Sequence, residues 1–186
     1  MARLVEVKGH EYVLRALAQL RARCPEIRYD LVGDGPLRPK LEQLVIELGL
    51  GETVALHGAR DGAFIKTLLA AAHLAVLASV NVEGDQEGQG LFLQEAQACG
   101  LPVVATEHGA LPEGLLPGQS GLLVPERDVA ALAQRLEYLV EHPEVWPEMG
   151  RRGRAFVEEH YDISQLNAQL VELYRRTRSV FDQAKG

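Results

Sequence analysis

The sequence predicts an α/β fold, namely a doubly wound, Rossmann-like parallel sheet followed by C-terminal helices. Short apolar runs alternate with segments of helical periodicity from the N-terminus to about residue 125, which is the pattern of βαβ units. The connections between these segments are short, as crossovers in a parallel sheet usually are. From about residue 128 to 182 the periodicity is helical throughout.

The individual elements follow from apolar spacing and from glycine and proline punctuation. In the first helix, which begins after Lys8-Gly9, apolar residues recur on one face at Tyr12, Val13, Leu17 and Leu20. We expect strands at 27–32, 54–57, 74–78, 102–106 and 121–125, with the end of a longer strand at 3–5. We expect the later helices at 37–48, 64–72, 89–99, 129–141, 144–160 and 164–182.

Capping residues divide the C-terminal helices. Pro143 and the pair Tyr161-Asp162 mark the two breaks between them. Asp128 and Ser164 stand at helix starts, where a short polar side chain can accept a hydrogen bond from an otherwise unpaired amide. We therefore expect both residues to be N-caps.

Composition and charge limit the class of protein. The 186 residues, 47% of them apolar, suit one domain with a sizeable core. A net charge of -7 argues against broad nucleic-acid binding, which needs a basic surface, but allows a small anionic ligand held by a few cations. Two cysteines give no disulfide framework, and the sequence contains neither a signal peptide nor an apolar run long enough to cross a bilayer. We therefore expect a cytoplasmic protein without a transmembrane segment.

Ligands of parallel α/β sheets bind at the carboxyl ends of the strands. The loops that follow the expected strands are 6–9, 33–36, 58–61, 79–90 and 107–111. The segment 83–109 holds the most distinctive of them, because an acidic, glycine-rich loop turns there into a helix and then into a strand. The sequence therefore predicts a binding site at this edge of the sheet.

Two cations and two carboxylates are the candidates for chemistry at this edge. Lys8 lies just before a helix N-terminus, where the helix dipole disfavours a cation unless an anion binds there; Arg3 leads the same segment. Solvated surface cations would explain both residues without a ligand. Glu87 and Glu95 frame a helix start, where a carboxylate is favourable on its own account. Each residue has an ordinary explanation, but the combination points to a ligand.

Four segments in order make the chain resemble a known family. They are RLVEVKG at 3–9, GDGP at 33–36, EGQGLFLQEAQACGLPVVAT at 87–106 and GLLVP at 121–125. Together they resemble the donor-binding C-terminal domain of family-4 retaining glycosyltransferases, which forms one half of a GT-B fold. The lead-in GDQEG at 84–88 is similar to members that build bacterial exopolysaccharides of the colanic-acid type.

The resemblance implies catalytic roles for three residues. Arg3 and Lys8 match the basic pair that binds the donor diphosphate and stabilises the leaving group. Fixed cations suit this task, because departure of a nucleoside diphosphate develops negative charge. Glu87 matches the carboxylate that contacts the transferred sugar.

The resemblance also implies donor-binding roles. Glu95 matches the residue that accepts hydrogen bonds from the ribose hydroxyls. The remaining matches are the amides of Gly88, Gln89, Gly90 and Leu91, which face sugar hydroxyls and phosphate, and the backbone around Ala59 and Arg60, which contacts the base. We therefore expect a UDP- or GDP-sugar as donor, with neither a cofactor nor a metal ion at this site.

The chain departs from the family pattern in three places. Val7 stands where a second lysine is common, and Gln89 replaces an aromatic or aliphatic residue. The first strand is clipped, and the resemblance implies that the N-terminal acceptor domain is absent, so that residues 1–186 are the donor domain alone. An excised piece, a gene fragment and half of a split enzyme would each explain this.

A clipped first strand and an absent acceptor domain would change how the isolated chain behaves. We expect the isolated chain to bind nucleoside diphosphate weakly, to transfer nothing, and to associate with itself through uncovered apolar surface. The missing domain or a partner chain would complete the enzyme, and the missing half could bring it to the inner membrane as a peripheral protein.

Other interpretations remain open. An isomerase related to nucleotide-sugar 2-epimerases shares the two-domain architecture, and a non-catalytic nucleotide-binding remnant would keep the fold. Glu83, Asp85 and Glu87 alternate in sequence and could hold Mg²⁺ against phosphates. A solvated acidic loop at a helix start explains the alternation without a metal, and we favour that explanation.

Overall fold

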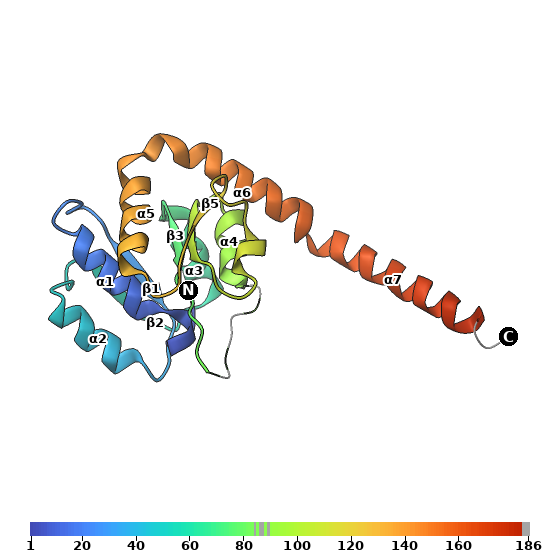
Figure 1. Cartoon of the computed structure of the whole chain (residues 1–186), viewed down its shortest axis with the longest axis horizontal. Helices are drawn as coiled ribbons and strands as arrows, with labels where there is room; N and C mark the ends of the chain where they lie inside the picture. Colours follow the sequence, from blue (N-terminus) through green and yellow to red (C-terminus); the bar gives the residue numbers. More distant parts are fainter. Residues whose placement is uncertain (84, 86–87, 89, 184–186) are drawn as a thin grey trace.

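A computed structural model describes the chain except for residues 84, 86–87, 89 and 184–186. Within the described residues, short strands and α-helices alternate and then give way to helices alone, as predicted (Figure 1). The strands are β1 (Tyr29–Val32), β2 (Val54–Gly58), β3 (Ala75–Leu77), β4 (Val103–Thr106) and β5 (Gly121–Val124). The helices are α1 (His10–Leu20), α2 (Arg38–Glu47), α3 (Gly62–Ala71), α4 (Leu91–Ala98), α5 (Val129–Glu141), α6 (Trp146–His160) and α7 (Ile163–Gln183). Three 3₁₀ turns join them: η1 (Glu6–Lys8), η2 (Leu111–Gly114) and η3 (Pro143–Val145).

The strands pair in parallel, but in two ladders rather than one. β1 pairs with β2, and β4 lies between β3 and β5. The expected end of a strand at 3–5 is not assigned as a strand. Its amides do reach the end of β1: Ala2 donates to the carbonyl of Val32 at 3.0 Å and Leu4 to that of Asp34 at 2.9 Å. The chain then turns into η1, so no ladder develops.

Helices cover both faces of the β3–β5 sheet. In β4, Val104 belongs to an apolar cluster with α1, α2 and α5, whereas Val103 and Ala105 belong to a second cluster with α4. This division follows from the strand period of two residues, which sends successive side chains to opposite faces. The doubly wound arrangement is therefore confirmed.

The structure confirms the predicted buried face of α1 and one of the two predicted helix caps. On α1, Val13, Leu17 and Leu20 are buried, as their spacing predicted. Asp128 caps α5 by accepting a hydrogen bond from the Ala131 amide at 2.8 Å. The predicted cap at Ser164 is wrong, because the amide of Ser164 instead donates to the side chain of Asp162 at 3.0 Å.

A buried amide fastens α4 to the segment before β5. The side chain of Gln97 is fully buried; its nitrogen donates to the Gly114 carbonyl at 2.7 Å, and its oxygen accepts from the Ser120 hydroxyl at 2.8 Å. Both halves of the amide are thereby satisfied, as burial of a polar group requires. This links α4, η2 and the start of β5.

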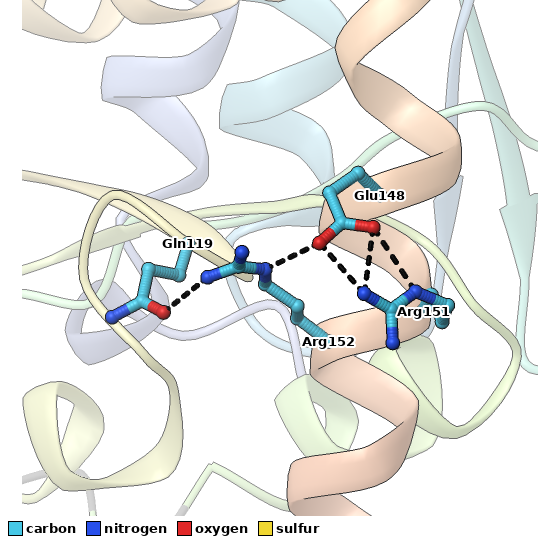
Figure 2. Close-up of polar contacts among 4 residues, drawn as sticks. All are labelled: Gln119, Glu148, Arg151 and Arg152. Carbon is cyan, nitrogen blue, oxygen red and sulfur yellow. Dashed lines mark hydrogen bonds and ion pairs between the residues drawn. The ribbon is translucent and has the colours of Figure 1, made fainter.

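Helix α6 closes over the same region. Figure 2 shows Glu148 accepting from Arg151 and Arg152, while Arg152 also donates to Gln119 ahead of β5. Beneath this surface network the backbones come very close, since a Cβ on Gly150 would lie 2.0 Å from the carbonyl oxygen of Gly100. A glycine is therefore required where α6 crosses the end of α4.

Helix α7 leaves the body of the molecule and extends into solvent (Figure 1). Residues 162–178 are all exposed. They include several large apolar side chains, namely Ile163, Leu166, Leu170, Val171, Leu173 and Tyr174. Within the described part of the chain, no helix is both long enough and apolar enough to cross a membrane.

The close crossing of α6 and α4 gives a stability prediction. Gly150→Ala should lower the free energy of unfolding by about 1–3 kcal/mol, because backbone rather than a movable side chain opposes the new methyl group. Gly62→Ala is the matched control, since a Cβ there meets nothing within 4 Å. It should change stability by less than about 0.5 kcal/mol. Urea unfolding of the three proteins measures both effects, and equal stability of the two variants would contradict the packing argument.

Candidate functional site

A cavity of about 480 Å³ lies where the N-terminal segment meets the start of α4. Its volume falls within the range of small-molecule sites. Its walls include five predicted site residues, namely Arg3, Lys8, Gly90, Leu91 and Glu95, together with Met1, Ala2, Leu77 and Phe92. The structure therefore brings together residues from opposite ends of the predicted site, up to 92 positions apart in sequence (from 3 to 95).

Lys8 is placed by a very tight contact with the end of β3. Gly9 adopts a left-handed conformation with φ 61°, and a Cβ on it would lie 1.7 Å from the carbonyl oxygen of Ala78. The amide of Val80 donates to the Val7 carbonyl at 2.9 Å, which holds the same segment from the other side. Only glycine fits at position 9, so the turn that presents Lys8 is fixed by backbone geometry.

The first turn of α4 forms the opposite wall. Gly90 is its N-cap, with φ 59°, and a Cβ there would lie 2.5 Å from a methyl carbon of Leu111. No described side chain caps this helix. In this turn the Leu93 amide donates to the Gly90 carbonyl at 2.7 Å, and the positive end of the helix dipole favours an anion or ligand oxygens at this wall.

His10 contacts the backbone carbonyl of Arg3, a role that the sequence did not predict. The ring is buried at the start of α1, and its Nε2 lies 3.1 Å from the carbonyl oxygen of Arg3. Because a carbonyl can only accept, Nε2 carries the proton and the ring is neutral when Nδ1 is bare. Burial lowers the pKa of His10 to about 4, against a smaller opposing effect of the Arg3 carbonyl. The sequence signal for this role is the position of His10 on the same helix face as the apolar residues Val13 and Leu17.

The ionisable groups of the cavity act on one another. Burial lowers the pKa of the Met1 amine to about 5. The charge of Glu95 raises that pKa and the charge of Lys8 lowers it, so all three groups lie within electrostatic reach. A carboxylate and two basic groups thus share one small space.

The loop after β3 is anchored by the loops after β4 and β5. Glu126 accepts hydrogen bonds from the amide of Asn81 at 2.6 Å and from Nδ1 of the buried His108 at 2.7 Å. Arg127 donates to the carbonyl of Asn81, and the hydroxyl of Thr106 donates to that of Ser79 at 2.5 Å. The entry to the glycine-rich segment is therefore fixed from two neighbouring loops.

The ionisation of Glu126 reflects these contacts. Burial raises its pKa, but the hydrogen bonds from the Asn81 amide and the His108 ring together outweigh burial, and the net shift is downward. Glu126 is therefore held as a carboxylate at neutral pH.

The other predicted site residues do not line this cavity in the described part of the chain. Ala59 and Arg60 follow β2 and are exposed; the Arg60 guanidinium carbon lies 5.0 Å from the ring centre of Phe64. Gly88 is exposed as well. Glu87 and Gln89 lie outside the described residues, so their predicted roles stay predictions.

The described residues contain no candidate metal site. Among the described residues, no group of three histidine, cysteine, aspartate or glutamate side chains is arranged to hold a metal ion. The alternation of Glu83, Asp85 and Glu87 includes a residue outside that part of the chain.

The fold and the cavity define a Rossmann-like domain with a ligand site at the carboxyl ends of its strands. The family model described as glycosyl transferases group 1 matches residues 1–142. The chain belongs to this family and has the fold of one half of a GT-B glycosyltransferase, which confirms the predicted family and fold class.

Individual relatives agree with this placement. WcaL of Escherichia coli strain K12, named as a colanic acid biosynthesis glycosyltransferase, is 36% identical over 176 residues, which are 93% of this chain and 43% of WcaL. HepE of Anabaena, solved in complex with UDP, superposes with a TM-score of 0.85 at 28% identity, over 95% of this chain and 47% of HepE. The C-terminal domain of LpcC, a group 1 glycosyl transferase of Francisella tularensis, gives a TM-score of 0.78 at 25% identity, over 88% of this chain and 84% of that domain. The chain thus spans less than half the length of WcaL and of HepE.

Burial of His10 predicts a specific pH dependence. The unfolded chain binds a proton near pH 6.5, whereas folded His10 does so only near pH 4, so stability is lost as the pH falls between these values. The contribution is about 3 kcal/mol at most. His10→Asn should therefore flatten the stability curve in this window, measured by urea unfolding from pH 7 to pH 4. The exposed His160→Asn should leave the curve unchanged; parallel curves for wild type and His10→Asn would contradict the interpretation.

The anchoring role of Glu126 predicts a difference between two His–Glu pairs. Glu126→Gln should cost about 1.5–3 kcal/mol of stability, because it removes a charge that accepts two hydrogen bonds. Glu144→Gln is the control, since Glu144 forms a similar 2.9 Å contact with His142 on the exposed surface. It should cost less than about 1 kcal/mol. Thermal or urea unfolding compares them, and equal costs would show that the Asn81 anchor contributes nothing.

Proposed function

We propose that the chain binds a nucleoside-diphosphate sugar in the 480 Å³ cavity, as the donor half of a retaining glycosyltransferase. The observation that carries this proposal is the meeting of Arg3 and Lys8 with the uncapped start of α4 and with Glu95 in one cavity. Each of these features suits a different part of such a ligand.

The diphosphate would lie between the two cations and the first turn of α4. Its negative charge would balance Arg3 and Lys8, and the amides near Gly90 and Leu91 would donate to its oxygens. The same contacts would strengthen as the diphosphate leaves, because negative charge then develops on it. Family membership and the UDP bound by HepE support this assignment.

The nucleoside and the sugar would extend in opposite directions from the diphosphate. Glu95 is exposed at the cavity wall and is suited to accept hydrogen bonds from ribose hydroxyls. The base would then continue toward the loop of Ala59 and Arg60, and the sugar toward the segment that contains Glu87, Gly88 and Gln89. No metal ion or cofactor is invoked.

Transfer would need a second domain to present the acceptor, a saccharide or a lipid-linked molecule. The chain spans 43% of WcaL, and the acceptor half would come from a further N-terminal domain or from a partner chain. We expect the 186-residue chain alone to bind nucleotide without transferring sugar, and the complete enzyme to act in the cytoplasm on polysaccharide synthesis.

Calorimetric titration with UDP, GDP and their sugars tests the proposal. Lys8→Ala and Glu95→Ala should each weaken nucleotide binding about tenfold or more, because each removes a charge-assisted hydrogen bond of about 1.5–3 kcal/mol. Lys66→Ala, on the exposed surface of α3, is the control and should bind as wild type does. Binding should also survive EDTA.

Three outcomes would overturn the assignment. Absence of saturable binding by any nucleotide, in a sample that circular dichroism shows to be folded, would remove the site. Unchanged affinity in both variants would favour a remnant that binds nucleotide elsewhere. Epimerised nucleotide sugar, formed by a full-length form, would favour the isomerase.

A further inference from the structure

Arg127, in the loop after β5, has a strained backbone conformation. Its φ is 60°, and among the described residues it is the one non-glycine residue with a positive φ. A residue with a Cβ adopts this left-handed region at an energetic cost. Such a conformation persists where the surrounding structure requires it. The contacts of Arg127 and of its neighbour Glu126 therefore indicate what the conformation serves.

The two neighbours hold opposite sides of one residue, Asn81, in the loop after β3. The carboxylate of Glu126 accepts from the Asn81 amide at 2.6 Å, and the guanidinium of Arg127 donates to the Asn81 carbonyl. The other carboxylate oxygen lies 2.7 Å from Nδ1 of the buried His108, which holds Glu126 in turn. Successive side chains of an extended segment point to opposite sides, so the left-handed residue lets both reach one target. We call Glu126 and Arg127 the Asn81 clamp.

The residue before Asn81 holds the turn that carries Lys8. Val80 is fully buried, and its amide donates to the Val7 carbonyl at 2.9 Å. The carbonyl of Ala78 lies against the same turn, where a Cβ on Gly9 would approach its oxygen to 1.7 Å. The position of Lys8 therefore depends on the backbone just after β3.

Three successive peptide groups of this backbone are held from the end of β4 and from the loop after β5. The Thr106 hydroxyl donates to the Ser79 carbonyl at 2.5 Å, and this peptide group also contains the Val80 amide. The Asn81 clamp holds the next two groups, through the amide and the carbonyl of Asn81. Because each peptide group is planar, holding three in a row fixes the dihedral angles of the two residues between them. The direction of the Val80 amide is thereby set from across the sheet.

We propose that Glu126 and Arg127 are positioning residues for the ligand site, because their clamp on Asn81 keeps Lys8 where it meets the diphosphate. This inference rests on the proposed function and adds to it the residues that place its cation, 118 positions away (from 8 to 126). Neither residue is among the described residues that line the cavity, so both act through the backbone and touch no ligand. The strained conformation of Arg127 then serves ligand binding more than it serves stability.

Arg127→Asn separates these two roles. Asparagine accepts a positive φ more readily than most residues with a Cβ, but its side chain is too short to replace the guanidinium. Affinity for UDP or GDP, measured by calorimetry, should fall about three- to thirtyfold, while the urea midpoint stays close to that of wild type. Arg127→Lys keeps a charged donor of similar reach and should recover most of the affinity.

Arg21→Asn is the matched control. Arg21 is also exposed and also donates to a backbone carbonyl, that of Gly49, but it joins the end of α1 to the turn after α2. It does not line the cavity of about 480 Å³. The same substitution there should leave nucleotide affinity unchanged.

Hydrogen exchange in the ligand-free chain tests the clamp without any nucleotide. Arg127→Asn should speed exchange of the Val80 amide about tenfold, because it removes a charge-assisted hydrogen bond from the adjoining backbone. The amide of Tyr29, which donates to the Thr53 carbonyl at 2.8 Å, should exchange as in wild type and reports general stability. Unchanged exchange at Val80 would overturn the proposal.

A double-mutant cycle shows whether the clamp acts through Lys8. Arg127→Asn should weaken nucleotide binding in the wild-type chain and have little further effect in Lys8→Ala. A loss that persists undiminished in Lys8→Ala, or wild-type affinity in Arg127→Asn, would overturn the proposal. If the folded wild-type chain binds no nucleotide, the proposed function fails instead, and exchange at Val80 still decides whether the clamp holds the turn.

Discussion

The contact between Gly9 and the carbonyl of Ala78 is the constraint on which the ligand site depends. It brings the N-terminal segment against the end of β3 with no room for a side chain, so the turn that carries Lys8 and the start of α1 have one possible position. Hydrogen bonds from Ala2 and Leu4 then fix the same segment to the end of β1. The site is therefore positioned by backbone contacts, and its charged side chains are added to a rigid frame.

The N-terminal segment also explains how an acidic protein can offer a site to an anion. The chain carries a net charge of -7, yet Arg3, Lys8 and the positive end of α4 face a single cavity. Fields from fixed charges and dipoles are strongest at short range inside a concave surface, while distant surface charges are screened by salt. Local arrangement, more than net charge, decides which ligands such a surface attracts.

The sequence predicted what depends on periodicity and local chemistry. The fold class, the order of elements and the cap at Asp128 follow from patterns within a few residues of one another. Arg3, Lys8 and Glu95 line one cavity, and their roles in it stay predictions. The division into two ladders depends on hydrogen bonds between distant segments, which periodicity does not encode. His10 and Glu126 were missed because each acts on a backbone group whose position depends on the tertiary fold. At the last helix, Asp162 and Ser164 are both good caps, and the local sequence does not decide between them.

Helix α7 differs from the rest of the molecule in what maintains it. Residues 162–178 are exposed, and the described support is local, such as the ion pair of Arg176 with Glu172 one turn away. Helices without tertiary contacts owe their stability to intrinsic propensity and lose it gradually with temperature. The chain therefore combines two kinds of order: a body that melts cooperatively, and a helix, α7, that loses its structure gradually at temperatures where the body is intact. Circular dichroism would then record a sloping baseline of helix loss before the main transition, and limited proteolysis would trim the chain back toward Asp162 while the ligand cavity stays whole.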